Sequence, residues 1–286
     1  MIRMIVRQSP QPPRPREYDD LSRQPWYLPS LHSLVDRMNL RPGERGFDGG
    51  CGTGNATHLI LDKVGPTGFV VGVDLSDDML AVARPKFEGL KNAAFVKGSF
   101  TDLSAAVAPY RPLSFGVSAH VIHYLSEGDR PKAITEAAKA IEPGGRFGFS
   151  TLYFEGSKSP EVAARYQRFS RILVRKLAEA YRGDREFVRT AMEPFRLRET
   201  KAEDYRRFME DAGFDVTHFS TDPIAVNAET LKVIYDSRHT AKAFLPKVPE
   251  DVAYQLLKES IEEATADISD EQTAPQRMLC IIGRKK

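Results

Sequence analysis

The sequence predicts an α/β fold, a mostly parallel sheet with helices on both faces, and three observations support this prediction. Short apolar runs alternate with helical patterns between about residues 45 and 152 of the 286-residue chain. The run at 69–73 is rich in valine and continuously apolar, which is typical of a parallel strand buried on both faces. A turn with glycines at 50, 52 and 54 joins the first strand to the first helix. Right-handed crossovers are therefore expected throughout.

Two segments precede the sheet. Residues 1–16 mix arginines with prolines and are expected to form a flexible arm. Residues 18–40 carry apolar side chains at helical spacing from Leu28 to Met38, which predicts an amphipathic helix and a candidate lid.

The glycine turn carries the most functional information. It follows Phe47-Asp48 and reads Gly49-Gly50-Cys51-Gly52-Thr53-Gly54-Asn55, and an apolar helix at 56–64 follows it. Glycine permits positive φ and lets a ligand lie against bare backbone, while the first amides of the helix point above the turn. This turn is expected to bind a ligand.

The spacing of this turn differs from the dinucleotide fingerprint Gly-x-Gly-x-x-Gly, because the third glycine comes one residue early. Asp48 would repel a pyrophosphate and would suit an ammonium group. These residues resemble the first motif of the class I S-adenosylmethionine-dependent methyltransferases, acidic-x-Gly-x-Gly-x-Gly. The resemblance implies a doubly wound seven-stranded sheet of order 3-2-1-4-5-7-6, with the last strand antiparallel.

The second strand ends in an acid at the rim where open α/β sheets bind ligands. The resemblance implies that Asp74 takes the ribose hydroxyls, and the alternative is a simple loop acid. Ser76 or Asp77 is expected to cap the next helix, which carries Met79. The cofactor contacts expected around the turn and this strand are Asp48, Gly50, Cys51, Gly52, Thr53, Gly54, Asn55, Asp74, Leu75 and Met79.

The third strand, 93–97, leads into Gly98-Ser99-Phe100, which is similar to the segment that presents the adenine pocket in this family. Ser99 replaces the usual aspartate, and a hydroxyl accepts a hydrogen bond from an adenine amino group more weakly. Phe100 either lies against the base or belongs to the core. We expect Gly98, Ser99 and Phe100 to contact the cofactor.

The fourth strand, 113–119, is followed by His120-Val121-Ile122-His123, similar to the family segment that passes under the sulfonium. A helix, the turn Pro143-Gly144-Gly145 and a fifth strand follow. Methyl transfer is an in-line displacement that depends mainly on positioning, and a base is needed only for a poorly acidic acceptor. His120 and His123 are the catalytic candidates, with packing as the alternative. His120, Tyr18 and Tyr27 are also expected to contact the cofactor; the alternative for Tyr27 and Trp26 is to anchor the lid helix.

The expected domains are a flexible arm at 1–16, the lid helix and cofactor-binding core at 17–152, a helical cap insertion at 153–200, and a C-terminal part at 201–286. That part should contain a helix, a sixth strand at about 214–220, a second insertion at about 226–266 and a seventh strand at 277–283. In the first insertion, Arg165, Arg168, Arg171 and Arg175 recur at helical spacing. They form either an anion site or a solvated helix face.

The composition favours a cytoplasmic enzyme. Charged residues make up 28% and the net charge is +2, which gives no reason to expect a nucleic-acid partner. Two cysteines supply neither a metal site nor a disulfide framework. Stable membrane insertion is not expected, because no apolar run of about 18 residues occurs.

We therefore predict an S-adenosylmethionine-dependent methyltransferase, a monomer or homodimer, that releases S-adenosylhomocysteine and acts on a small-molecule acceptor. The acceptor atom, oxygen, nitrogen or carbon, stays open, and so does the choice among lipid, quinone, terpenoid and aromatic natural product. The alternatives are a non-catalytic S-adenosylmethionine-binding or assembly protein, a nucleic-acid methyltransferase and, more weakly, a nicotinamide oxidoreductase.

Overall fold

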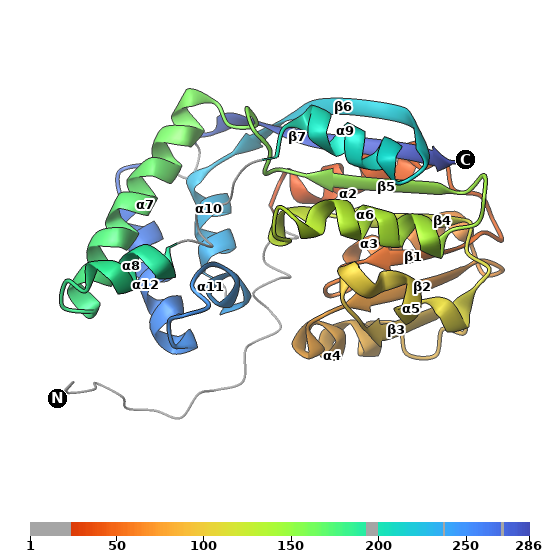
Figure 1. Cartoon of the computed structure of the whole chain (residues 1–286), viewed down its shortest axis with the longest axis horizontal. Coiled ribbons are helices and arrows are strands. Elements are labelled where there is room, and N and C mark those ends of the chain that lie inside the picture. The colour runs from red at the N-terminus through yellow and green to blue at the C-terminus, as the bar shows by residue number, and fades with distance from the viewer. Residues whose placement is uncertain (1–23, 193–199, 237, 270–271) are drawn as a thin grey trace.

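Seven strands form one mixed sheet in the computed structural model, which describes residues 24–192, 200–236, 238–269 and 272–286 (Figure 1). The order is β3-β2-β1-β4-β5-β7-β6, as predicted, and β7 runs antiparallel to both of its neighbours. The strands are β1 (Arg45–Gly49), β2 (Phe69–Asp74), β3 (Ala93–Lys97), β4 (Phe115–Ala119), β5 (Arg146–Thr151), β6 (Phe214–Val226) and β7 (Ala274–Lys285).

Helices cover both faces of the sheet. One face packs on α2 (Tyr27–Arg37), α3 (Asn55–Val64) and α4 (Asp77–Lys86), through side chains such as Leu34, Ile60 and Val117. The opposite face packs on α5 (Leu103–Ala106), α6 (Asp129–Ala140) and α9 (Ala202–Asp211), through side chains such as Leu103, Ile134 and Tyr205. Three short 3₁₀ turns complete this half: η1 (Phe100–Asp102), η2 (Ala108–Tyr110) and η3 (Ile122–Tyr124).

The remaining helices form a second body, here called the helical lobe. It consists of α7 (Pro160–Ala180), α8 (Arg185–Ala191), α10 (Ala228–Tyr235), α11 (Arg238–Phe244) and α12 (Glu250–Thr265), which share a separate apolar core. Figure 1 shows the lobe on the side toward which the arrow of β5 points, so it faces the carboxyl edge of the parallel strands. Ligands bind at this edge in open α/β sheets.

Local sequence explains where several of these helices begin and end. Ser159 caps α7 by accepting a hydrogen bond from the Val162 amide at 3.3 Å, and Pro160 stands at its first turn. Asn227 caps α10 by accepting from the Thr230 amide at 2.8 Å. Gly213, with φ +91°, follows the end of α9, where glycine adopts the left-handed conformation at little cost.

Several predicted boundaries were wrong. β6 and β7 are longer than the predicted 214–220 and 277–283, because they continue to pair with each other as far as Val226 and Ala274. Prolines and polar side chains in this extension, such as Pro223 and Pro275, concealed it from a search for apolar alternation. The second insertion, expected at about 226–266, contains the three helices α10, α11 and α12.

The lid helix is described only in part. Its α2 segment begins at Tyr27, whereas the prediction started at residue 18, and residues 1–23, with the expected arm and Tyr18, lie outside the described residues. In the described part of the chain, no helix combines the length and apolar character needed to cross a bilayer.

Candidate active site

The glycine turn lies at the carboxyl end of β1 and opens α3. Gly50, Gly52 and Gly54 have φ values of +73°, +52° and +89°, which residues with a Cβ rarely adopt. A Cβ at Gly50 would lie 2.3 Å from the side chain of Val121, and one at Gly54 would lie 2.5 Å from the ring of Phe87. The turn therefore requires glycine both for its backbone shape and for its close packing.

Polar atoms without partners surround this turn. Asp48 is 1% exposed; its Oδ2 accepts from Thr57 Oγ1 at 2.6 Å, while its Oδ1 is buried and has no hydrogen-bond partner among the described residues. Asn55 Nδ2 is likewise buried and unpartnered within the described chain. Burial raises the pKa of Asp48 to about 7. A buried carboxylate and a buried amide without partners fit a ligand that brings a cationic donor and an acceptor.

Asp74 connects the glycine turn to the next helix. Its Oδ2 accepts from the Gly52 amide at 2.8 Å and its Oδ1 accepts from the Ser76 amide at 2.9 Å. Each carboxylate oxygen has further acceptor capacity, so these bonds leave room for ribose hydroxyls. Sequence reasoning missed the bond to Gly52, because only the folded register brings the end of β2 beside the turn. Ser76, as predicted, caps α4 through the Met79 amide at 3.3 Å.

The residues expected to border the adenine differ in their surroundings. Ser99 Oγ accepts from the Thr101 amide at 3.2 Å and lies 2.8 Å from Thr101 Oγ1, so local bonds already use much of its capacity. Phe100 is 7% exposed and packs edge-on against Phe147 in the core, which is the alternative weighed for it. Leu75, in contrast, is 68% exposed.

His120 follows β4 in a left-handed conformation with φ +59°, an uncommon conformation for a residue other than glycine. Its amide donates to the Ser150 carbonyl at 3.0 Å, and its Nε2 lies 2.8 Å from Ser30 Oγ. Its Nδ1 is buried without a hydrogen-bond partner in the described chain. Burial lowers the pKa of His120 to about 4, so the ring is neutral at pH 7.

His123 lies in η3 and differs from His120 in its bonding. Its Nδ1 is 3.0 Å from Thr151 Oγ1, and its ring centroid lies 4.4 Å from that of Tyr124 and 4.6 Å from that of Tyr153. Burial, with smaller contributions from His120 and Arg130, lowers its pKa well below the ordinary value. Both predicted histidines are therefore neutral, but only His120 has Nδ1 without a partner.

The aromatic rings of the lid segment gather at His120. The ring centroids of Trp26 and Tyr27 lie 5.5 Å and 5.6 Å from that of His120. Trp26 Nε1 also donates to Thr230 Oγ1 of α10 at 3.2 Å, which joins the lid segment to the helical lobe. A chain of tyrosines continues into the lobe: Tyr153 Oη lies 3.2 Å from Tyr166 Oη, and the rings of Tyr166 and Tyr235 are in edge contact. Sequence analysis missed Ser30, Tyr153 and Tyr166.

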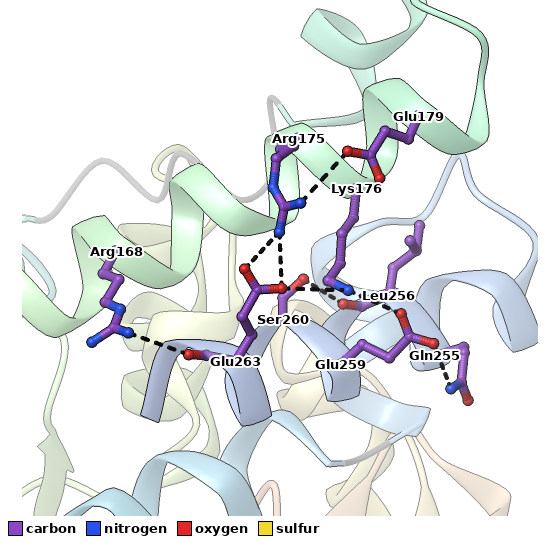
Figure 2. Close-up of polar contacts among 9 residues, drawn as sticks. All are labelled: Arg168, Arg175, Lys176, Glu179, Gln255, Leu256, Glu259, Ser260 and Glu263. Carbon is purple, nitrogen blue, oxygen red and sulfur yellow. Dashed lines mark hydrogen bonds and ion pairs between the residues drawn. The ribbon is translucent and has the colours of Figure 1, made fainter. Parts of the chain in front are cut away.

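The arginine stripe of α7 divides into a buried and an exposed part. Arg165 is buried and donates to the carbonyls of Val226 and Gln272 at 3.3 and 3.4 Å. Arg175 Nη2, in contrast, lies 2.6 Å from Glu263 Oε1 of α12, and Lys176 lies between Glu259 and Glu263 (Figure 2). Arg168 pairs with Asp267 at 2.5 Å. Arg168 and Arg175 thus join α7 to α12, a role that neither sequence alternative included.

Comparison with known proteins agrees with this geometry. The family model for a methyltransferase domain matches residues 47–145. The chain is 29% identical over 185 residues to the ubiquinone/menaquinone biosynthesis C-methyltransferase UbiE of Vibrio parahaemolyticus, covering 65% of this chain and 70% of the relative. It is 28% identical over 186 residues to demethylmenaquinone methyltransferase of Staphylococcus aureus, covering 63% and 72%. The YcgJ protein of Bacillus subtilis shares the fold with a TM-score of 0.55 at 18% identity, covering 90% of this chain and 98% of that one.

The sheet order and the glycine turn at its carboxyl edge define a Rossmann-like methyltransferase domain. The matched methyltransferase domain and the methyltransferase relatives support a class I S-adenosylmethionine-dependent methyltransferase. The match to a methyltransferase domain implies the use of S-adenosylmethionine.

Proposed function

We propose that the chain transfers a methyl group from S-adenosylmethionine to a phenolic ring of the quinone class, bound in its reduced, hydroquinone form. The observation that carries the methyl-donor part is the unpartnered pair Asp48 Oδ1 and Asn55 Nδ2 beside a turn of three glycines with positive φ. The bound cofactor would supply an electrophilic methyl group on a sulfonium.

The residues of the turn would hold the cofactor. Asp48 would face its ammonium group, and the turn Gly50, Cys51, Gly52, Thr53 and Gly54 would lie under its amino-acid part. Asp74 would accept from the ribose hydroxyls while it continues to hold the Gly52 amide. Leu75, Met79, Gly98 and Ser99 would border the adenine, whereas Phe100 would support the site from the core, since its ring lies where a Cβ at Gly49 would come within 3.2 Å of it.

Two lines of support favour the hydroquinone acceptor. The relatives that match about two thirds of this chain are named for methylation in quinone biosynthesis. In addition, the neighbours of His120 and His123 are aromatic: Trp26, Tyr27, Tyr124 and Tyr153. Such rings suit a planar apolar acceptor. The reduced form is required because an electrophilic methyl group needs an electron-rich ring.

The acidity of the acceptor fits the same class. His120 has a pKa of about 4, so it is a weak base toward an aliphatic alcohol and better matched to the more acidic hydroxyl of a phenol. We propose His120 as the residue that takes this proton, and His123 as its neighbour that packs against Tyr124 and Tyr153. We also propose that the helical lobe is a cap that shapes the acceptor site and excludes water.

A labelled-methyl assay tests the proposal. The purified chain is incubated with methyl-labelled S-adenosylmethionine and, in separate reactions kept under reductant, a prenylated naphthohydroquinone lacking one ring methyl, a catechol and an unsaturated fatty acid. Transfer to the naphthohydroquinone is expected. Transfer only to the fatty acid would overturn the acceptor class. Tight binding of S-adenosylhomocysteine by calorimetry without transfer to any acceptor would favour a non-catalytic binder.

A further inference from the structure

Ser30 of α2 is a buried side chain that contacts a catalytic candidate. It is 2% exposed, and its Oγ lies 2.6 Å from the Tyr27 carbonyl oxygen and 2.8 Å from His120 Nε2. It lies one helical turn beyond Trp26, at the start of α2. No sequence motif drew attention to this serine.

The two bonds of Ser30 determine where the proton of the His120 ring lies. A serine hydroxyl has one hydrogen, and a carbonyl oxygen can only accept, so the Ser30 hydrogen is donated to Tyr27. Toward His120, Ser30 Oγ is therefore the acceptor, and Nε2 must be the donor. A neutral imidazole has only one N–H, so Nδ1 has the free lone pair.

The orientation of this lone pair is also fixed. The left-handed backbone of His120 is held by the hydrogen bond from its amide to the Ser150 carbonyl. Its ring packs against the rings of Trp26 and Tyr27. The Nδ1 atom is buried and has no partner within the described residues. A buried acceptor that has no hydrogen-bond donor destabilises the folded protein. The hydroxyl of a bound acceptor molecule would supply the missing donor.

We propose that Ser30 is a positioning residue for methyl transfer, which holds His120 in its Nε2–H tautomer so that Nδ1 takes the proton of the acceptor. This inference rests on the proposed function. The acceptor O–H bond breaks, its proton forms an N–H bond at Nδ1, and the electron pair left on the acceptor would form the new bond from the ring carbon to the methyl group. The S–CH3 bond would break at the same time, with its electron pair staying on the sulfur of the S-adenosylhomocysteine product. The ring carbon then loses its hydrogen as a proton to the acceptor oxygen, which restores the hydroquinone, and Nδ1 releases its proton to solvent. While Nδ1 holds the proton, the imidazolium keeps its Nε2–H bond to Ser30.

The tautomer can be measured without any substrate. Nitrogen-15 spectra of histidine-labelled protein at pH 7 separate bare from protonated ring nitrogens, and comparison with His120→Gln assigns the His120 signals. We expect Nε2 of His120 to carry the proton in the wild type. A proton on Nδ1 of the wild-type protein would overturn the inference, whatever the variants do.

Three serine variants extend the test to catalysis. Ser30→Ala removes the acceptor for Nε2–H, so we expect a mixture of tautomers and a kcat lower by at least about tenfold, with an unchanged KM for the acceptor. Ser30→Thr keeps a hydroxyl and should restore the Nε2–H tautomer. Ser260→Ala is the matched control, since Ser260 is also a buried helical serine that donates to a backbone carbonyl, Leu256, at 2.6 Å but lies in α12.

The outcomes separate this inference from the proposed function. An Nε2–H tautomer in the wild type and mixed tautomers in Ser30→Ala, with no turnover of any acceptor, would contradict the function and leave the bonding argument standing. Turnover of the hydroquinone by the wild type, with equal kcat for Ser30→Ala and Ser260→Ala, would reject the positioning role of Ser30 alone.

Discussion

Polar side chains differ in their partners between the carboxyl edge of the sheet and the contact between α7 and α12. At the edge, Asp48 Oδ1, Asn55 Nδ2 and His120 Nδ1 are buried and have no partners among the described residues. At the α7–α12 contact, Arg175, Lys176 and Glu263 are partly exposed and form ion pairs with one another or with neighbours (Figure 2). Both regions are rich in polar side chains, but only one of them satisfies those groups internally.

This difference separates function from stability. An unpartnered buried polar group lowers the free energy of unfolding, and it persists where a ligand supplies the missing partner. Exposed ion pairs contribute little free energy and need no ligand. Substitutions at the edge should therefore change binding and catalysis, and can even increase stability, whereas substitutions in the contact should change stability slightly and nothing else.

The largest expected effect is that of Asp48→Asn on stability without ligand. Burial raises the pKa of Asp48 from 3.8 to about 7 in the folded protein. Between about pH 4 and 7 the folded state keeps a proton that the unfolded state has released, so the wild-type free energy of unfolding falls as pH rises and levels off above 7. The difference between the pKa values of the folded and unfolded states corresponds to a loss of at most about 4 kcal/mol of stability, at 1.36 kcal/mol per pKa unit.

Urea unfolding of the ligand-free wild type and of Asp48→Asn at pH 5, 6, 7 and 8 measures this effect. The stability of the variant relative to the wild type should grow with pH, while its affinity for S-adenosylhomocysteine should fall at pH 8. The buried histidines have lowered pKa values and change stability with pH in the opposite direction to Asp48. Both proteins carry the same histidines, so this contribution cancels in the difference between wild type and variant. Parallel stability curves would show that the Asp48 carboxyl is not held in a protonated state by burial.

The next effect is on turnover. His120→Ala should lower kcat by about 10²-fold or more if His120 takes the proton of the acceptor. The wild-type rate should not depend on His120 ionisation between pH 6 and 9, since its pKa is about 4 and the neutral ring dominates throughout. His58→Ala, at an exposed position on α3, is the control. An unchanged kcat for His120→Ala across this pH range would return His120 to a packing role.

The features that depend on local sequence could be predicted, and those that depend on contacts between distant residues could not. The glycine turn and the acid ending β2 are local signals at fixed spacing, and the order of the strands was implied by the family resemblance that these signals carry, so the core could be predicted. The tautomer of His120 could not, because it depends on Ser30, which lies 90 residues earlier. Nothing in the local sequence around His120 indicates that its φ is positive.

The helical lobe was harder to predict. The arginines of α7 are regularly spaced, but their partner Glu263 lies 88 residues after Arg175, in a helix whose orientation depends on tertiary packing. Arg165 belongs to the same stripe and is nevertheless buried against backbone carbonyls. Periodicity gave the helix correctly and gave no information on what each arginine faces.

A smaller effect is expected at Asp74. Asp74→Ala removes the proposed ribose contacts and should weaken binding of S-adenosylhomocysteine by about 1 to 3 kcal/mol, measured by calorimetry. Asp74 also accepts a hydrogen bond from the Gly52 amide, and the variant removes this acceptor. Part of the loss of affinity should therefore come from a less stable glycine turn. Asp78→Ala, an exposed acid on α4, should bind as the wild type does. Equal affinity in the two variants would contradict both roles of Asp74.

The smallest effect is expected in the α7–α12 contact. Arg175 and Glu263 have side chains 52% and 46% exposed, so a double-mutant cycle with Arg175→Ala and Glu263→Ala should give a coupling of about 0.2 to 1 kcal/mol in urea unfolding. The cycle is needed because Arg175 also approaches Glu179 and Glu263 also approaches Lys176. The coupling should shrink in 1 M salt, where the Debye length is about 3 Å. Turnover should stay at the wild-type value; a loss of turnover in either single variant would mean that the contact positions the lobe for catalysis, and the division between the two regions would fail.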